Sequence, residues 1–166
     1  MQKLAHALLS SLALLLCACD EKHAPARAGL DTRFDIGVGG RTVQARVTCT
    51  DEERQNGLMH VESMPEHEGM LFLARRPIKH GFWMKNTLIP LDIGYFTGDG
   101  VLREVHPMYP RNLDRVESRR DDIRYALEMN QGWFRSNGVG PGDRLDLEGV
   151  SRAIRSRGYD PATWID

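Results

Sequence analysis

Cysteine is scarce in this chain, and its spacing excludes the common uses of paired cysteines. Only three cysteines occur among the 166 residues, at positions 17, 19 and 49, and no two form a C-x-x-C pair. The sequence therefore predicts neither a thioredoxin-like redox motif nor a zinc site of paired cysteines. Cys49 falls on the apolar face of the alternating segment 41–49, so we expect a small buried thiol without a nucleophilic role.

Short motifs that mark several kinds of catalytic site are also missing. The chain contains no G-x-S-x-G, no H-E-x-x-H and no Walker phosphate loop, which removes the direct signatures of α/β-hydrolases, zinc metalloproteases and P-loop NTPases. Methionine and histidine are frequent between Met59 and Met70, a mixture that suits copper(I). Their spacing defines no coordination sphere, so we expect no metal ion and no other cofactor.

The chain has no large excess of one charge, and its N-terminal apolar run is too short to span a membrane. Lysine and arginine number 22 against 23 aspartates and glutamates, a net charge of −1, so the sequence offers no electrostatic basis for binding nucleic acid. The N-terminal apolar run covers only residues 7–18, which is shorter than the ~20 residues needed to cross a bilayer. Behind Lys3, this run has the form of the apolar part of a secretory signal peptide.

The end of the apolar run resembles the bacterial lipobox. The sequence LCAC at residues 16–19 implies removal of residues 1–18 and attachment of a lipid to Cys19. The alternative is an ordinary cleaved signal with a soluble product. Residues 19–30 contain alanine, proline and charge without an apolar period, which predicts a flexible tether after the lipid. The lipobox interpretation places the protein at the periplasmic face of a membrane, and Asp20 favours the inner over the outer membrane by a rule that differs between bacteria.

Residues 31–150 predict a mainly β domain. Short apolar segments, several of them alternating with polar residues, are separated by turn residues, and this pattern is typical of an antiparallel sandwich or a barrel-like domain. The predicted strands are residues 41–49, 69–74, 81–85, 91–96, 101–108, 124–129 and 143–149.

One short helix is predicted near the N-terminal end of this domain. Thr50 and Glu53 have the spacing of a capping box, and Gly57 provides a helix end, so the helix should cover about residues 51–56. The polar segment 111–123 predicts an exposed connection or a short exposed helix. Residues 151–166 form a C-terminal extension, and its arginines indicate either a solvated terminal turn or contact with anionic lipid.

A few charged residues interrupt the apolar segments and form the candidate site. Lys85, Asp92 and Glu128 lie in segments that otherwise predict buried strands, and burial of such groups is costly unless they are paired. With the neighbouring Trp83 and Asn86, they define a candidate binding pocket. Structural ion pairs, or a solvent-facing side of the sheet, are the alternative explanation.

Five segments of the chain resemble a known protein family. The segments ERQNGLMH, GMLFLA, FWMKNTLIPLDIGYF, YALEMNQG and GVGPGDRL have the content and order of the domain of unknown function 192 family, over residues 43–145. The resemblance implies a compact, mainly β domain that is often secreted or tethered to a membrane. It supplies no catalytic residues. His60 stands where the family often has arginine, and the C-terminal extension lies beyond the family pattern.

Three classes of function are compatible with these observations. The first is a binding module whose pocket takes a small polar ligand, a glycan or a peptide. The second is an accessory lipoprotein that docks on an envelope protein through an exposed apolar patch. The third is a hydrolase or isomerase in which Asp92 or Glu128 acts as a base. The expected partners are a membrane through Cys19 and a small ligand or envelope protein, without nucleic acid.

Overall fold

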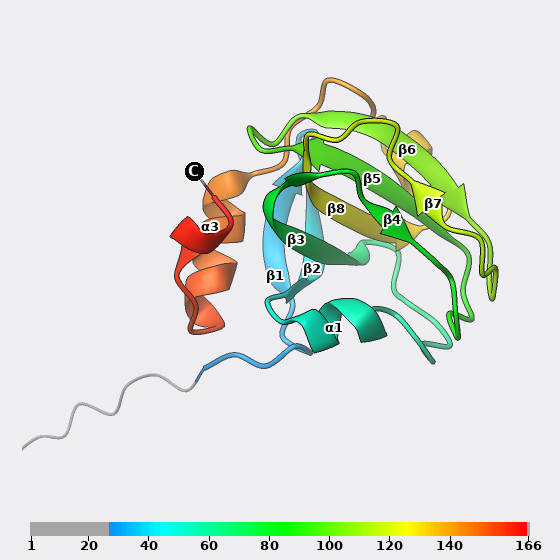
Figure 1. Cartoon of the computed structure of the whole chain (residues 1–166), viewed down its shortest axis with the longest axis horizontal. Helices are drawn as coiled ribbons and strands as arrows, with labels where there is room; N and C mark the ends of the chain where they lie inside the picture. The colour runs from blue at the N-terminus through cyan, green and yellow to red at the C-terminus, as the bar shows by residue number, and fades with distance from the viewer. Residues whose placement is uncertain (1–26, 166) are drawn as a thin grey trace, which may run out of the picture.

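The computed structural model describes residues 27–165 of the chain (Figure 1). The predicted signal peptide, the predicted lipid attachment at Cys19 and most of the predicted tether lie outside these residues. None of the helices within residues 27–165 has the length and hydropathy needed to cross a membrane.

The described residues form a mainly β domain with a few short helices, as the sequence predicts. The strands are β1 Phe34–Val38, β2 Arg41–Thr48, β3 Glu68–Ile78, β4 Gly81–Phe82, β5 Leu91–Thr97, β6 Leu102–Met108, β7 Val116–Glu117 and β8 Ile123–Asn130. The helices are α1 Asp51–Asn56, α2 Trp133–Ser136 and α3 Leu147–Ser156, followed by the 3-10 turn η1 Pro161–Thr163.

Six strands form one mixed sheet in the order β1-β2-β3-β8-β5-β6, and β4 pairs with β7 in a separate ribbon. All neighbours in the large sheet are antiparallel except β2 and β3, which run parallel. The prediction of an antiparallel arrangement is wrong at this pair. The reason is the long connection 49–67, which includes α1 and returns the chain to the same end of the sheet. The sheet is open, with β1 and β6 at its edges, and does not close into a barrel.

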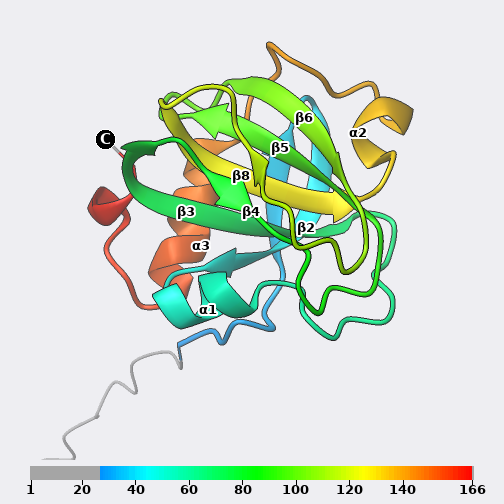
Figure 2. The same cartoon turned by 45° about the vertical axis from the view of Figure 1, so that its right-hand side comes forward.

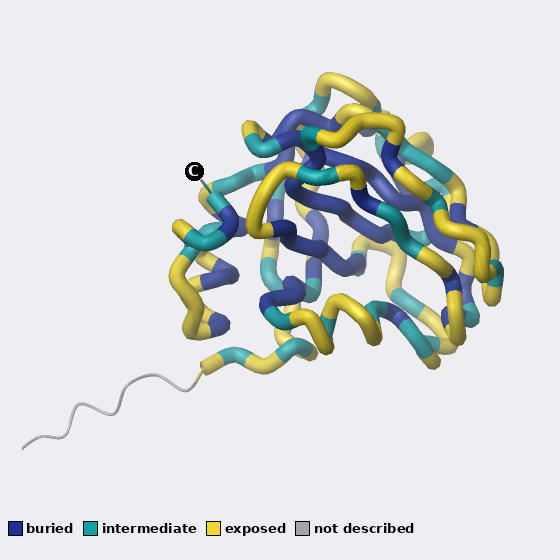
Figure 3. Tube along the Cα trace, viewed as in Figure 1, coloured by how far each residue is buried: buried dark blue, intermediate teal, exposed yellow. Residues whose placement is uncertain are grey.

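Each face of the sheet carries its own apolar cluster. On one face, α3 packs beside β1 and β2, and its Val150, Ala153 and Ile154 are fully buried. On the other face, Phe82 of β4 and Val116 of β7 pack against the second cluster. Figures 1 and 2 show α3 on one side of the large sheet and the ribbon of β4 and β7 on the other. The central strands β3, β5 and β8 are buried along most of their length (Figure 3).

Helix α1 begins and ends as its sequence predicts. The backbone N–H of Glu53 donates to the Thr50 hydroxyl at 3.2 Å, and the Glu53 carboxylate accepts from the Thr50 N–H at 3.1 Å. Gly57 ends the helix with a φ of 48°, in the left-handed region that glycine adopts readily. These contacts fix α1 next to the end of β2.

The C-terminal residues depart from the sequence prediction. The segment 143–149 makes only isolated bridges with Val38 and Val101, and the chain enters α3 at Leu147. The strand predicted there is wrong, because the alternation of Leu145 and Leu147 is followed by the helical spacing of Val150, Ala153 and Ile154.

The extension is also more than a solvated terminal turn. Trp164 is buried, and its carbonyl oxygen accepts a 3.0 Å hydrogen bond from the Tyr125 hydroxyl of β8. Arg157 is buried as well, with hydrogen bonds to the Val47 carbonyl and to the Glu53 carboxylate. The C-terminal residues therefore complete the core of the domain.

Candidate functional site

A cavity lies on the face of the sheet that carries β4. It has a volume of about 620 Å³, within the range of roughly 300–1,000 Å³ that is common for small-molecule sites. We call it the Glu128 cavity; it is lined by residues 54–59, Phe72, Ile78, residues 80–83, residues 85–87, Arg115 and Glu128.

The strand register places Glu128 on the cavity side of the sheet. Glu128 of β8 is paired with Met70 of β3 and Ile93 of β5, and directly paired residues share a face. Met70 and Ile93 both belong to the apolar cluster beneath β4. Glu128 is therefore a carboxyl group set into an apolar surface.

The Glu128 carboxyl is nearly enclosed and has no hydrogen bond with another described residue. The residue is 5% exposed. Burial raises the pKa of Glu128 to about 8, and the positive charge of Arg46 offsets this only in part. Arg46 lies on β2, two strands away from Glu128 across β3, so the backbones of the two residues are about 10 Å apart. At neutral pH the carboxyl therefore keeps its proton.

Asp92 does not belong to this cavity, so the predicted five-residue pocket is not assembled as expected. Asp92 of β5 is paired with Met129 of β8, one position along from the Ile93–Glu128 pair. Successive side chains of a strand point to opposite faces, and Met129 belongs to the cluster on the α3 side. The two carboxyl groups consequently face away from each other, and the structure provides no paired carboxylates for acid–base chemistry.

The environment of Asp92 accounts for it structurally. Its Oδ2 accepts a 2.7 Å hydrogen bond from the backbone N–H of Gly132, the residue before α2. Burial raises the pKa of Asp92, while this hydrogen bond and the charge of Arg135 act in the opposite direction. Gly132 has a φ of 87°, a conformation that few residues other than glycine adopt. The Asp92 carboxylate therefore stabilises the turn that contains Gly132.

His80 is a residue of the cavity that the sequence does not single out. It is 5% exposed, its ring stacks on Phe82 at a centroid distance of 5.7 Å, and its Nε2 has no hydrogen-bond partner among the described residues. The His80 N–H donates to the Ser118 hydroxyl at 3.0 Å and the His80 carbonyl accepts from the Ser118 N–H at 2.9 Å, which holds the residue in place. Burial, assisted by the charge of Arg54, lowers the pKa of His80 to about 4, so the ring is neutral at pH 7. A single histidine before an apolar segment has no periodic signal that could have identified it.

Aromatic rings pack together beside Glu128 and His80. The rings of Phe72 and Phe82 pack edge to face with their centroids 4.9 Å apart, and the centroid of Phe82 lies 6.2 Å from that of Tyr95. The Tyr95 hydroxyl donates to the Val116 carbonyl of β7 at 2.7 Å. The hydrogen bond joins the large sheet to the ribbon of β4 and β7, so the aromatic rings are held between the two.

The remaining predicted residues lie at the corner after β4, which replaces most of the strand predicted over residues 81–85. Trp83 is 45% exposed, and the Lys85 Nζ lies 5.3 Å from the centroid of its ring. Asn86 has a φ of 56°, and its carbonyl accepts a 2.9 Å hydrogen bond from the His60 N–H. The structure thus brings Trp83, Lys85 and Asn86 to the same cavity as Glu128.

The match to a family model covers most of the described chain. Residues 34–147 match the DUF192 model, described as Uncharacterized ACR. The chain belongs to the DUF192 family. The DUF192 match ends at the first residue of α3, so the buried C-terminal residues described above lie beyond it.

Two solved structures resemble this DUF192 protein. A protein of unknown function from Novosphingobium aromaticivorans DSM 12444 is 28% identical, with a TM-score of 0.67 over 75% of this chain and 94% of that one. A protein from Sinorhizobium meliloti 1021, described as a candidate transcription regulator, is 32% identical, with a TM-score of 0.62 over 68% of this chain and 94% of that one. No curated protein matches the chain significantly.

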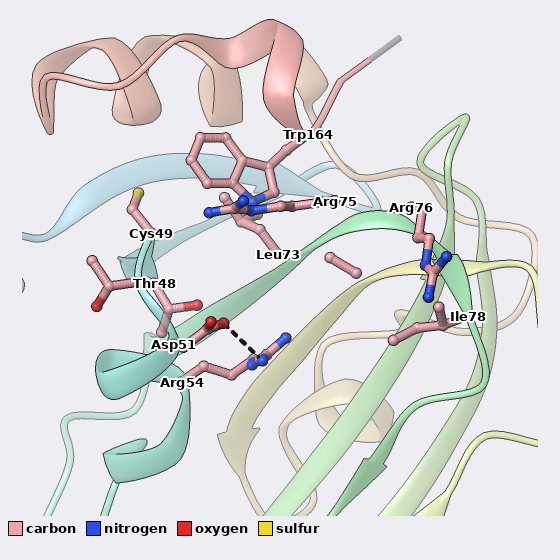
Figure 4. A pocket seen from close by; sticks show the side chains of 11 residues that line it. Thr48, Cys49, Asp51, Arg54, Leu73, Arg75, Arg76, Ile78 and Trp164 are labelled. Atoms are coloured by element: carbon pink, nitrogen blue, oxygen red, sulfur yellow. Dashed lines mark hydrogen bonds and ion pairs between the residues drawn. The ribbon is translucent and has the colours of Figure 1, made fainter.

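A smaller cavity of about 200 Å³ lies on the other side of Arg54 in this DUF192 protein (Figure 4). Figure 4 shows Arg75 beside Trp164, whereas Arg54 points to Asp51, with which it forms a 2.8 Å ion pair. Cys49 is buried at its edge, as predicted, and burial raises the pKa of this thiol to about 11, so it stays protonated. The polar groups here are exposed or paired, and the Glu128 cavity is the stronger candidate site.

Proposed function

We propose that this DUF192 protein is a binding module that takes a small polar ligand into the Glu128 cavity. One observation carries the proposal: Glu128 and His80 are both buried against the same cavity, and the Glu128 carboxyl and the His80 Nε2 lack hydrogen-bond partners among the described residues. Nearly all buried polar groups in proteins are hydrogen-bonded. A ligand that bonds to the His80 Nε2 would recover the cost of leaving this buried atom unsatisfied, about 1–3 kcal/mol.

The walls of the cavity support a ligand with a ring or another flat apolar body. Phe72 and Phe82 present aromatic surface beside the buried polar groups, and Trp83 adds an exposed ring at the edge. Apolar walls with a few directed polar groups are the usual composition of small-molecule sites. A catalytic function has less support, because Asp92 and Glu128 are on opposite faces of the sheet.

We further propose that the protein works at the cell envelope, held by a lipid on Cys19. The signal-like segment and the LCAC sequence support this localisation, and Asp20 favours the inner membrane. The backbone N–H of Ala28 donates to the Ser156 carbonyl at the end of α3. Residues 27–33 do not line the Glu128 cavity, so a tether that leaves from this position would not obstruct the ligand.

A second candidate function is docking on an envelope protein. Trp83, Tyr109 and Leu113 are large exposed apolar residues on two loops that are joined by backbone hydrogen bonds. Residue clusters of this kind are common in protein interfaces. The description of the Sinorhizobium protein as a candidate regulator does not extend to DNA binding here, because the net charge of −1 provides no electrostatic attraction.

The binding proposal is tested by a thermal-shift screen of small metabolite-like compounds on the wild-type protein and two variants. A ligand that binds only the folded state raises its stability by mass action. We expect compounds that stabilise the wild type to lose their effect with Glu128→Gln and to keep it with Asp92→Asn, the matched change on the opposite face. Compounds that stabilise all three proteins equally, or a screen without any stabilising compound, would contradict the proposal.

A further inference from the structure

Charge is unevenly distributed over the Glu128 cavity. Glu128 is the one carboxyl-bearing residue among the described residues that line it, and this side chain is buried. Three cationic residues, Arg54, Lys85 and Arg115, line the same cavity, and all three are exposed. Arg54 is paired with Asp51, whereas Lys85 and Arg115 form no ion pair with a described residue. The cavity therefore has an acidic group in its interior and cationic groups toward solvent.

The interior is suited to a cation once Glu128 is ionised. Arg46 is the positive charge that acts on Glu128, and these two described residues form no ion pair. Tyr95 and His80 also face this region, and both are uncharged at neutral pH: burial lowers the pKa of His80 to about 4 and raises that of Tyr95 well above its usual range. Neither group repels an ammonium, and the rings of Phe72 and Phe82 line the same cavity.

We propose that the ligand of the Glu128 cavity is a zwitterion with a ring or short apolar body, whose ammonium contacts Glu128 and whose anionic group contacts Lys85 and Arg115. This inference rests on the proposed binding function and specifies its ligand class. A ligand with only an anionic group would leave Glu128 without a partner. A ligand with only a cationic group would lie against three exposed positive charges.

Binding of the ammonium is coupled to loss of a proton. In the free protein the Glu128 carboxyl is protonated at pH 7, because burial raises its pKa to about 8. An adjacent ammonium stabilises the carboxylate, so the carboxyl proton passes to the buffer when the ligand binds. Close to one proton should be released for each ligand bound at pH 7, and almost none should be released well above pH 8.

The test uses four compounds that share one ring and differ only in charge. They are 4-(aminomethyl)benzoate, 4-methylbenzylamine, 4-methylbenzoate and 4-methylbenzyl alcohol, which are respectively zwitterionic, cationic, anionic and neutral. Isothermal titration calorimetry at pH 7, in two buffers with different ionisation enthalpies, measures the Kd and the number of protons released. The proteins are the wild type, Glu128→Gln, Lys85→Ala with Arg115→Ala, and Asp92→Asn as the control on the opposite face.

We expect the wild type to bind the zwitterion most tightly and to release close to one proton. Glu128→Gln should weaken this binding by about 10- to 100-fold and abolish proton release, because a charge-assisted hydrogen bond is lost. The double variant at the exposed cations should weaken it by about 3- to 10-fold with proton release intact, and Asp92→Asn should change neither quantity.

The possible failures separate the ligand class from the binding function. If the neutral or the anionic compound binds as tightly as the zwitterion and is sensitive to Glu128→Gln, the cavity binds ligands but the zwitterion inference is wrong. If the zwitterion binds without proton release, the proposed contact with Glu128 is wrong. If none of the four compounds binds the wild type, both the inference and the proposed binding function are contradicted.

Discussion

Asp92 and Glu128 lie on the neighbouring strands β5 and β8 and are offset by a single residue, so that their side chains point to opposite faces of one sheet. Asp92 accepts a hydrogen bond from the Gly132 N–H on the α3 side, whereas Glu128 is buried beside the cavity under β4. One carboxyl thus supports a turn, and the other is available to a ligand. This division leads to separate predictions for the two residues.

Replacement of Asp92 should affect stability and leave ligand binding unchanged. Asp92→Ala removes the acceptor of the Gly132 N–H, which should lower the free energy of unfolding by about 1–2 kcal/mol. Asp92→Asn retains an acceptor oxygen and should cost less. Urea denaturation of the three proteins measures the difference, and an Asp92→Ala variant as stable as the wild type would show that the hydrogen bond is not important for the fold.

Glu128 should make the stability of the protein depend on pH. Its pKa is about 8 in the folded protein and near the ordinary 4.5 in the unfolded chain, so between these values the folded state binds more protons. The contribution of Glu128 is fully present below pH 4.5 and is lost as the pH rises to about 8, with a slope of up to about 1.4 kcal/mol per pH unit. The other charged and titratable groups that face this carboxyl or line its cavity are Arg46, His80, Tyr95, Arg54, Lys85 and Arg115. Burial keeps His80 neutral in the folded protein above about pH 5 and keeps Tyr95 protonated throughout.

Denaturation curves of the wild type and Glu128→Gln at pH 5 and pH 8 test this dependence. Glutamine cannot ionise, so the variant should lose less stability between the two pH values than the wild type does. Equal losses in the two proteins would mean that Glu128 titrates near its ordinary value in the folded state.

Arg157 should be necessary for the stability of the domain, although it lies in the C-terminal extension. Its guanidinium forms a buried ion pair with Glu53 and a 2.6 Å hydrogen bond to the Val47 carbonyl. Glu53 in turn accepts hydrogen bonds from the N–H groups of Cys49 and Thr50 at the start of α1. Arg157→Leu would leave this carboxylate without its cation, which should lower the free energy of unfolding by about 2–4 kcal/mol.

Arg155→Leu is the matched control, because Arg155 is exposed in the last turn of α3, two residues before Arg157. It should change the stability by less than about 0.5 kcal/mol. If chemical denaturation finds equal effects for the two arginines, the C-terminal extension does not support α1 through this ion pair.

The two candidate functions predict different consequences for three exposed apolar residues. Trp83 lines the Glu128 cavity, whereas Tyr109 and Leu113 lie on the adjoining loop and are not among its lining residues. Under the binding proposal, Trp83→Ala should weaken a ligand by about 10-fold through loss of aromatic contact, with Tyr109→Ala and Leu113→Ala near the wild-type affinity. Equal loss of affinity from all three would indicate a broad interface instead. Calorimetry on the three single variants distinguishes these results.

Local sequence patterns predict the parts of this fold that depend on local contacts. The alternation over residues 41–49 corresponds to β2, and the Thr50–Glu53 capping box corresponds to α1. The pattern fails at residues 143–149, where Leu145 and Leu147 alternate like a strand but the chain enters α3. The helical spacing that decides this segment begins only with Val150, beyond the alternating residues.

The candidate site could be predicted only in part, because it depends on strand register. Trp83, Lys85 and Asn86 lie next to one another in the sequence, so their shared position at a corner is a local property. Asp92 and Glu128 are on strands that meet only in the folded protein, and Ile93, not Asp92, is paired with Glu128. A shift of one residue would have placed both carboxyls on the same face. The sequence offers His80 only as one of several scattered histidines and methionines, because its place in the cavity depends on burial between β4 and the sheet.

The central claim is that Glu128 is a neutral buried carboxyl that binds a cationic group of the ligand. Carbon-13 NMR of the glutamate side-chain carboxyls tests this claim most directly. Glu128→Gln identifies the Glu128 resonance by its disappearance. A pH titration of the free protein should give a pKa near 8 for this resonance. Saturation with 4-(aminomethyl)benzoate should lower it by about two units or more, because release of close to one proton at pH 7 requires a largely ionised carboxyl in the complex. A resonance that titrates near 4.5 in the free protein, or one whose pKa does not change with the compound, would contradict the account.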